Sequence, residues 1–282
     1  TPRVAHPTGP TLIISDGGLP ALVAAAIEAE RVASAGEGGG GAPALLMPWV
    51  TSPILADAQL AAVSSQARFL RQEQLEPAPI QAFAAGTSAA FLDTLGLLAA
   101  VEVARANSCA RIVWPSHAHA TDDSLEGDIE RIANAVDRAL LVERLAGLES
   151  DVIGTAAAAE IAIETPLVDL TDTQLAELVV DLDAPAYLCW WWRPAADPAA
   201  EKTAAAERET WRAALDRAGW VSASPDVTIS APAQPKTAKK GLASVRIAWG
   251  TFSGCRITSP GDRALNGEPA PILNSTAPEM GM

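Results

Sequence analysis

With 282 residues, 49% of them hydrophobic and 19% charged, the chain can bury a large core and is too apolar to be disordered throughout. Its 34 acidic and 20 basic side chains give a formal net charge of −14, which argues against a nucleic-acid partner because phosphate backbones would be repelled. Its three cysteines lie far apart, which argues against a disulfide framework or a CxxC metal site and predicts a reduced, cytoplasmic setting.

Hydrophobic patterning predicts strands and helices in alternation. In chain order, a strand at residues 11–15 precedes a helix at 19–35, a strand at 44–49 precedes a helix at 57–75, and a short strand within 77–83 precedes a helix at 87–106. A strand at 111–114 then precedes a helix at 127–149, a strand at 161–164 precedes a helix at 171–181 with a threonine cap, and a last strand at 187–191 precedes a helix at 201–218.

This alternation predicts an α/β fold, a Rossmann-like sheet of about five parallel strands with helices on both faces. Ligands bind beyond the carboxyl ends of such strands, so a site is expected in the loops at 15–19, 49–54, 84–88 and 116–123. The most apolar window, 83–104, contains Asp93 and Glu102 and predicts a buried helix, so no membrane partner is expected. Residues 1–220 are expected to form this domain, and residues 221–282 a C-terminal extension with a β-hairpin and a loose tail.

Four stretches occur in a characteristic order. The first strand leads into DGGLPA at 16–21, GTSAAFL at 86–92 opens the helix before the strand at 111–114, IETPLVDLT occupies 163–171, and the segment at 188–192 is followed by ALDRAG at 214–219. This order resembles the 7-cyano-7-deazaguanine synthases, whose loop has the form SGGxDS and whose third segment reads TPLxDLTK. They belong to the PP-loop ATP pyrophosphatase superfamily. The resemblance implies a Rossmann-like fold of the adenine nucleotide alpha hydrolase type and a role in queuosine biosynthesis.

The resemblance also implies a nucleotide site formed by Ser15, Asp16, Gly17, Gly18, Thr87 and Ser88, with ATP and Mg²⁺ as cofactors if the family's activity survives. The two glycines permit the close backbone approach that phosphates need, although a tight turn between strand and helix would need the same small residues.

Several positions depart from the family's pattern in one direction. Asp16, Pro20 and Ala21 stand where the family has serine and aspartate, and Asp172 follows DLT where the family has lysine. An alignment shifted by one residue places Ser15 at the family's serine and makes Asp16 an insertion, but leaves Pro20 and Ala21 unexplained.

Thr87 and Ser88 likewise replace an Arg-Asn motif. Cations and hydroxyls that could meet ATP are therefore lost, and acids, proline or alanine stand in their place.

The family's zinc ligands are lost as well. Four cysteines hold a zinc ion in the family, whereas Trp192, Lys202, Ala205 and Arg208 occupy the matching region here. Cys189 remains nearby and is predicted to be a small buried apolar residue. We therefore expect no zinc.

The residues also indicate a second candidate site. His117, His119, Asp122 and Asp123 follow a strand end, where they could bind a metal or act as acid and base, although a solvated polar loop without a metal is the favoured interpretation. Trp49 and Trp190 complete the candidate pocket. Because Trp190, Trp191 and Trp192 cannot all face one side of a strand, they form either core alone or also a surface for a homo-oligomer.

Three functions fit these patterns. The favoured one is a relative of 7-cyano-7-deazaguanine synthase with a degenerate ATP loop, impaired in catalysis, that binds a nucleotide or another small molecule or acts as a scaffold. The alternative is an active ATP-dependent C–N ligase with a rebuilt site, acting on 7-carboxy-7-deazaguanine or a related acid. The third is an oligomeric structural protein that uses the three tryptophans.

Overall fold

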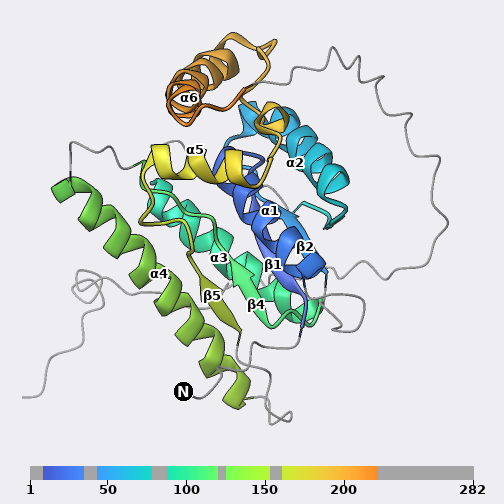
Figure 1. The fold of residues 1–282 in the computed structure, drawn as a ribbon. Coiled ribbons are helices and arrows are strands. Elements are labelled where there is room, and N and C mark those ends of the chain that lie inside the picture. The colour runs from blue at the N-terminus through green and yellow to red at the C-terminus, as the bar shows by residue number, and fades with distance from the viewer. Residues whose placement is uncertain (1–8, 35–42, 78–87, 120–124, 153–160, 222–282) are drawn as a thin grey trace, which may run out of the picture. The chain divides into compact units, whose positions relative to one another are not determined.

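Five short parallel strands form one sheet in the order β3-β2-β1-β4-β5. The strands are β1 Thr11–Ser15, β2 Ala44–Pro48, β3 Glu73–Gln74, β4 Arg111–Val113 and β5 Ala162–Glu164. The central strand β1 pairs with β2 on one side and β4 on the other, so that Leu12 lies opposite Leu45 and Ile112. The Rossmann-like α/β architecture expected from the alternation is confirmed (Figure 1).

The structure, a computed structural model, describes residues 9–34, 43–77, 88–119, 125–152 and 161–221. All of them belong to the first of the two units into which the chain divides, Thr1–Val227 and Thr228–Met282. The hairpin and tail expected in the C-terminal extension lie outside the described residues. The domain boundary at residue 220 stays a prediction.

Helices cover both faces of the sheet, because successive strand side chains point to opposite sides. Ile13, Leu46 and Val113 face one core with α1 Leu19–Ser34, α2 Ala56–Leu70, α5 Asp172–Asp181 and α6 Pro198–Arg217. Leu12, Met47 and Ile112 face the other core with α3 Ala89–Ala106 and α4 Leu125–Val152. Figure 1 shows α4 running beside α3 and β5. Two one-turn 3₁₀ helices, η1 Pro53–Leu55 and η2 Ala186–Leu188, complete the described elements.

The helix expected at 57–75 is wrong in its last turn. Helix α2 ends at Leu70, because Arg71 adopts the left-handed conformation (φ 55°) and its N–H bonds back to the Ala67 carbonyl. The chain then runs beside β2, so β3 forms the edge of the sheet where the helical pattern predicted another turn. Of the short strand expected within 77–83, residues 78–83 lie outside the described residues.

The strand expected at 187–191 is wrong as well. This segment contains the end of η2 and a turn, and the Trp190 N–H donates to the Gly17 carbonyl at 3.1 Å instead of to a neighbouring strand. The sheet still has five strands, since β3 supplies the fifth.

The expected start of α5 is confirmed. The Thr171 hydroxyl accepts from the Gln174 N–H while the Gln174 side chain accepts from the Thr171 N–H, which makes a capping box. No helix among the described residues is both long and apolar enough to cross a membrane.

Candidate functional site

A cleft of about 260 Å³ opens at the carboxyl ends of β1, β2 and β4. The strand order reverses between β1 and β4, and this is where ligands bind in open α/β sheets. The described residues that line the cleft come from three of the four expected loops, from the adjoining ends of β1 and α1, from residues 114–115 and from α3: Ile14, Asp16, Pro20, Trp49, Thr51, Asp93, Trp114, Pro115, Ser116, His117 and His119.

The cleft has aromatic walls and acidic groups. Trp49 and Trp114 follow β2 and β4 directly, and Trp49 lies so close to Gly96 of α3 that a Cβ there would be 2.9 Å from its ring. Asp93 pairs with Arg138 of α4 at 3.1 Å, so the acid that interrupted the apolar window has a partner. No Lys or Arg is among the described lining residues, so the positive charge that would compensate Asp16 is not supplied by them.

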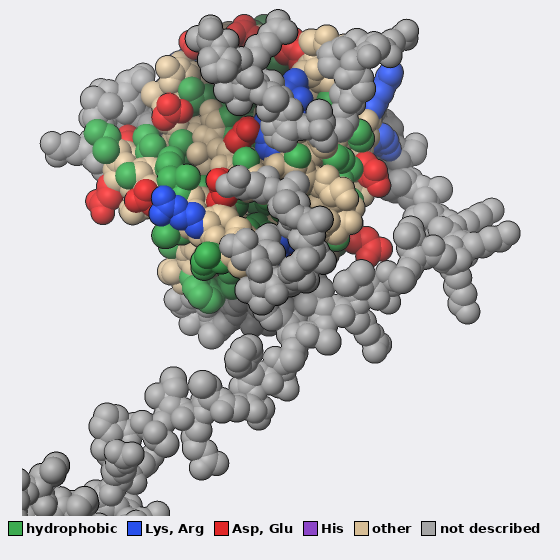
Figure 2. All heavy atoms as spheres, turned by 90° about the horizontal axis from the view of Figure 1, so that it is seen from below, with side chains coloured by type: hydrophobic (Ala, Val, Ile, Leu, Met, Phe, Trp, Pro, Cys, Tyr) green, Lys and Arg blue, Asp and Glu red, His purple; other side chains and the backbone are tan. Residues whose placement is uncertain are grey.

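Charges are mixed elsewhere on the described surface. On the face shown in Figure 2, Lys and Arg side chains are scattered singly among acidic and hydrophobic ones. The described side chains visible in this view form no continuous basic patch of the kind that attracts phosphate backbones.

The loop between β1 and α1 bonds to itself. The Gly17 N–H donates to the Ser15 hydroxyl at 3.2 Å, and the Gly18 N–H donates to the Asp16 carboxylate at 2.8 Å. The Gly17 carbonyl accepts from the Gln66 side chain at 3.0 Å as well as from Trp190. Two of the backbone donors that could cradle a phosphate before α1, those of Gly17 and Gly18, are therefore occupied by the chain's own oxygens.

Asp16 is held in this position at an electrostatic cost. Burial raises the pKa of its carboxyl, the Gly18 N–H lowers it, and the nearby Glu207 raises it further, so the pKa lies above its ordinary value. The ionised form is therefore disfavoured in the folded chain.

Replacing this carboxyl is expected to stabilise the fold at neutral pH. Asp16→Asn keeps an acceptor for the Gly18 N–H and removes the buried charge, so we expect the melting temperature at pH 7 to rise by about 2–4 °C, as for 1 kcal/mol in a domain of this size. Because the folded pKa is raised, the penalty arises as pH climbs above 3.8, the ordinary value, and is absent below it. Asp169→Asn, at an exposed carboxylate, is the control. A melting temperature lowered equally at pH 7 and pH 3 would contradict the prediction.

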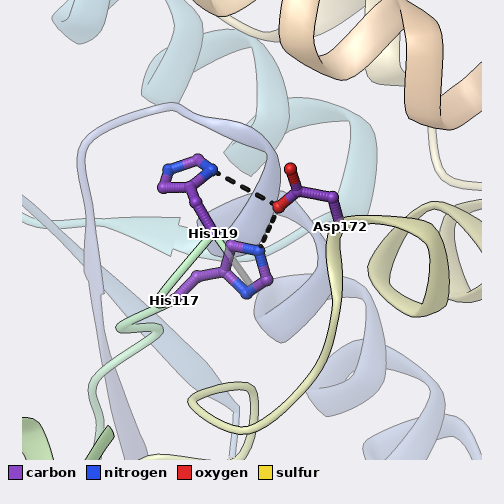
Figure 3. Close-up of side chains that lie close together, drawn as sticks. All are labelled: His117, His119 and Asp172. Carbon is purple, nitrogen blue, oxygen red and sulfur yellow. Dashed lines mark hydrogen bonds and ion pairs between the residues drawn. The ribbon is translucent and has the colours of Figure 1, made fainter. Parts of the chain in front are cut away.

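At the border of the cleft, three side chains converge from two distant segments (Figure 3). Asp172 Oδ1, at the first position of α5, lies 2.7 Å from His117 Nε2 and 3.4 Å from His119 Nδ1. One ligand atom from each of the three residues lies within 4.8 Å of the others. The His117 side chain is 1% exposed and that of Asp172 10%, whereas that of His119 is 42% exposed.

Local structure directs both imidazoles toward this carboxylate. His119 has a φ of 50°, a left-handed backbone conformation that is uncommon outside glycine. Its ring packs edge-on against that of His117, with 5.0 Å between the ring centroids. His117 Nδ1 lies 3.3 Å from the Leu167 carbonyl, in the same TPLVDLT segment that leads to Asp172. Trp211 of α6 covers the pair, with its ring 5.5 Å from that of His117 and 5.2 Å from that of His119.

The pKa values of Asp172 and His119 shift in opposite directions, each toward the charged form of its group. Burial by itself raises the pKa of the Asp172 carboxyl, but hydrogen bonds from His117 and His119 outweigh burial and hold that pKa well below its usual range. The hydrogen bond to Asp172 raises the pKa of His119 against the effect of burial, and Glu207 adds to the rise. Glu207 is itself hydrogen-bonded by the Trp211 indole N–H at 2.9 Å.

Only some of the predicted site residues line the cleft. Asp16, Trp49, His117 and His119 line the cleft, while Ser15 and the two glycines lie buried in the loop behind it. The Ser88 side chain caps α3 by accepting from the Phe91 N–H, and is absent from the described lining. Thr87, Asp122 and Asp123 lie outside the described residues. The solvated polar loop favoured for this histidine segment is wrong for His117, which is buried.

The three tryptophans separate into core and partly buried positions. Trp191 is 1% exposed, whereas Trp190 and Trp192 are partly buried at the edge of the same core, where Trp192 packs against Trp220. Trp190 is not among the described lining residues of the cleft. A homo-oligomer through these residues stays a prediction. Cys189 is buried as expected, and burial raises its thiol pKa.

Two residues of the site were missed. Asp172 lies 55 residues from His117 in the sequence, and no local pattern indicates their contact. Trp211 sits in an alanine-rich helix whose pattern shows one apolar face but not what that face covers.

Comparison with known proteins gives little further information. No protein-family model and no curated protein matches the chain. Among solved structures, one similar chain is the U34-tRNA thiolase NcsA from Methanococcus maripaludis with its [4Fe-4S] cluster, at 8% sequence identity and a TM-score of 0.45, covering 80% of this chain and 77% of that one. A similarity this distant decides neither the ligand nor the activity of the present chain.

Proposed function

We propose that the chain is a divergent relative of the 7-cyano-7-deazaguanine synthases that has lost ATP-dependent ligation and binds a small molecule without a polyphosphate group in the cleft above β1, β2 and β4. The supporting observation is the hydrogen bond from the Gly18 N–H to Asp16, because a phosphate would have to displace a carboxylate from this donor. It would also approach Asp16 and the neighbouring Glu207 with like charge.

The lining favours a neutral or cationic ligand with a flat ring. Trp49 and Trp114 offer aromatic surfaces, and Asp16 and Asp93 offer carboxylates at the same cleft. Aromatic faces bind rings and cations, while carboxylates accept from ring N–H groups or pair with an amine. A deazaguanine-type base without its nucleotide has this chemistry.

The alternative is the active ATP-dependent ligase. Gly17 and Gly18 still precede a helix N-terminus, and if Asp16 swung away it could hold Mg²⁺ beside the phosphates. This arrangement requires both the release of the Gly18 N–H and a cation from outside the described lining.

Titration with Mg-ATP separates the two functions. We expect no rise in melting temperature up to millimolar Mg-ATP, whereas a ligand at 100 times its Kd would add about 2.7 kcal/mol. We also expect no AMP release from ATP with 7-carboxy-7-deazaguanine and ammonia, and a rise in melting temperature with 7-cyano-7-deazaguanine or a related base. Trp49→Ala should abolish the response to the base, and Trp220→Ala, away from the cleft, should retain it. Saturable ATP binding or AMP release would sink the proposal.

A further inference from the structure

We propose that His117 Nε2, His119 Nδ1 and Asp172 Oδ1 form a binding site for one divalent transition-metal ion of the Zn²⁺ or Fe²⁺ class, at the border of the cleft. The sequence by itself favours a solvated polar loop at the histidines and gives no sign that Asp172 lies beside them. This inference does not depend on which small molecule the cleft binds.

The spacing of the donor atoms suits one ion. Nitrogen and oxygen ligands lie about 2.0–2.2 Å from Zn²⁺, so neighbouring ligands of a tetrahedral site are about 3.3–3.6 Å apart. Asp172 Oδ1 is 2.7 Å from His117 Nε2 and 3.4 Å from His119 Nδ1, and all three atoms lie within 4.8 Å of one another. The Asp172–His119 distance already matches this spacing, the Asp172–His117 distance is about 0.6 Å shorter, and the two nitrogens have to approach by at most about 1.5 Å.

The surroundings of His117 provide a second, independent observation. Its Nδ1 faces the Leu167 carbonyl and its Nε2 faces Asp172 Oδ1, so an acceptor oxygen lies beside each ring nitrogen. A neutral imidazole has one N–H and satisfies only one of them. When Nδ1–H donates to Leu167, Nε2 needs a cation beside the carboxylate: either the proton of its hydrogen bond to Asp172 or, in its place, a metal ion that both atoms bind. A backbone carbonyl on the second nitrogen is the usual outer partner of a metal-binding histidine.

The same carboxylate oxygen attracts a second imidazole. His119 lies against it despite a left-handed backbone, so both rings converge on Oδ1 (Figure 3). Trp211 covers both rings, and Asp172 is 10% exposed, which reduces competition from water. Two imidazoles and one carboxylate are ligands of Zn²⁺ and Fe²⁺, whereas Mg²⁺ and Ca²⁺ prefer oxygen alone.

The ion would be accessible from the cleft. His117 and His119 are both lining residues, so three protein ligands would leave at least one position for water or for a donor atom of the bound molecule. The site is separate from the cysteine zinc site of the resembled family, because none of its ligands is a thiolate.

The test uses the full chain without a polyhistidine tag, treated with chelator and titrated with Zn²⁺ by calorimetry and with Co²⁺ by visible absorption. We expect one ion per chain. His119→Ala should weaken Zn²⁺ binding more than about 100-fold, since loss of an outer partner alone costs about 10- to 100-fold. Asp172→Asn should weaken it similarly.

Two matched variants serve as controls. His6→Ala removes the only other histidine of the sequence, and Asp169→Asn removes an exposed carboxylate of the same segment, so both should bind as the unmodified chain does. Because His119 is 42% exposed, its variant should keep the far-ultraviolet dichroism of the fold, which separates loss of ligand from loss of structure. Absence of binding by the unmodified chain at millimolar Zn²⁺ and Co²⁺, or unchanged binding by a folded His119→Ala variant, would overturn the proposal.

Discussion

Gly17→Ala is expected to lower the free energy of unfolding by about 2–5 kcal/mol, the sum of about 1–2 for an alanine in the left-handed region and about 1–3 for overpacking. Gly17 has a φ of 75°, and a Cβ there would lie 2.7 Å from Ala62 Cβ and 2.9 Å from the Gln59 carbonyl oxygen. The second contact is with backbone, so the obstacle cannot rotate away. Urea denaturation measures the loss.

Gly219→Ala is the matched control for that loss. Gly219 has the same φ of 75° but no atom within 4 Å of the added Cβ, so only the conformational cost of about 1–2 kcal/mol is expected. The difference between the two variants measures how closely the loop lies on α2. Equal losses would contradict the structure, because they would show that the loop does not contact that helix.

The second large effect is expected from Trp211→Ala, at about 3–5 kcal/mol, the usual range for truncating a buried aromatic residue. Trp211 is 1% exposed and belongs to the core that α1, α2, α5 and α6 form on one face of the sheet. Its removal also exposes the two histidines and leaves Glu207 without the indole donor. The free energy of unfolding, measured in urea, should fall accordingly.

Two further variants separate the roles of this ring. Trp211→Phe keeps an aromatic ring over the histidines but removes the N–H, so it should lose less than half as much stability. Trp220→Ala removes a partly buried tryptophan from the edge of the same core and should also lose less than half as much. A loss from Trp220→Ala equal to that from Trp211→Ala would show that α6 does not bury Trp211 as described.

Gly17→Ala and Trp211→Ala test two features near the cleft, the loop after β1 and the cover of the histidine pair. The packing of Gly17 accounts for a glycine in the loop after β1 without invoking phosphate binding. Close contact with α2 already requires a residue that has no side chain and a positive φ. Trp211 explains why His117 is buried next to a carboxylate at an edge of the sheet that is otherwise open to a ligand. A glycine pair is thus a poor indicator of nucleotide binding when the adjoining helix is this close.

The sequence by itself determined the α/β class, the two-faced sheet and the capped start of α5. These features follow from interactions between neighbours, since burial of both faces makes the strands continuously apolar, and the Thr171 cap and Gln174 are three residues apart. The loops that follow β1, β2 and β4 were predictable for the same reason, because parallel strands bring their carboxyl ends to one edge.

Only the tertiary structure decided the chemistry at that edge. The contact of His117 with Asp172 spans 55 residues, and the bond from Gln66 to the Gly17 carbonyl spans 49. The two residues of β3 became a strand because β2 offered free backbone groups, and the segment at 187–191 became a turn because Gly17 accepted its N–H. Composition and periodicity report which side chains are apolar along one element, but a partner far away in the chain decides which donor meets which acceptor.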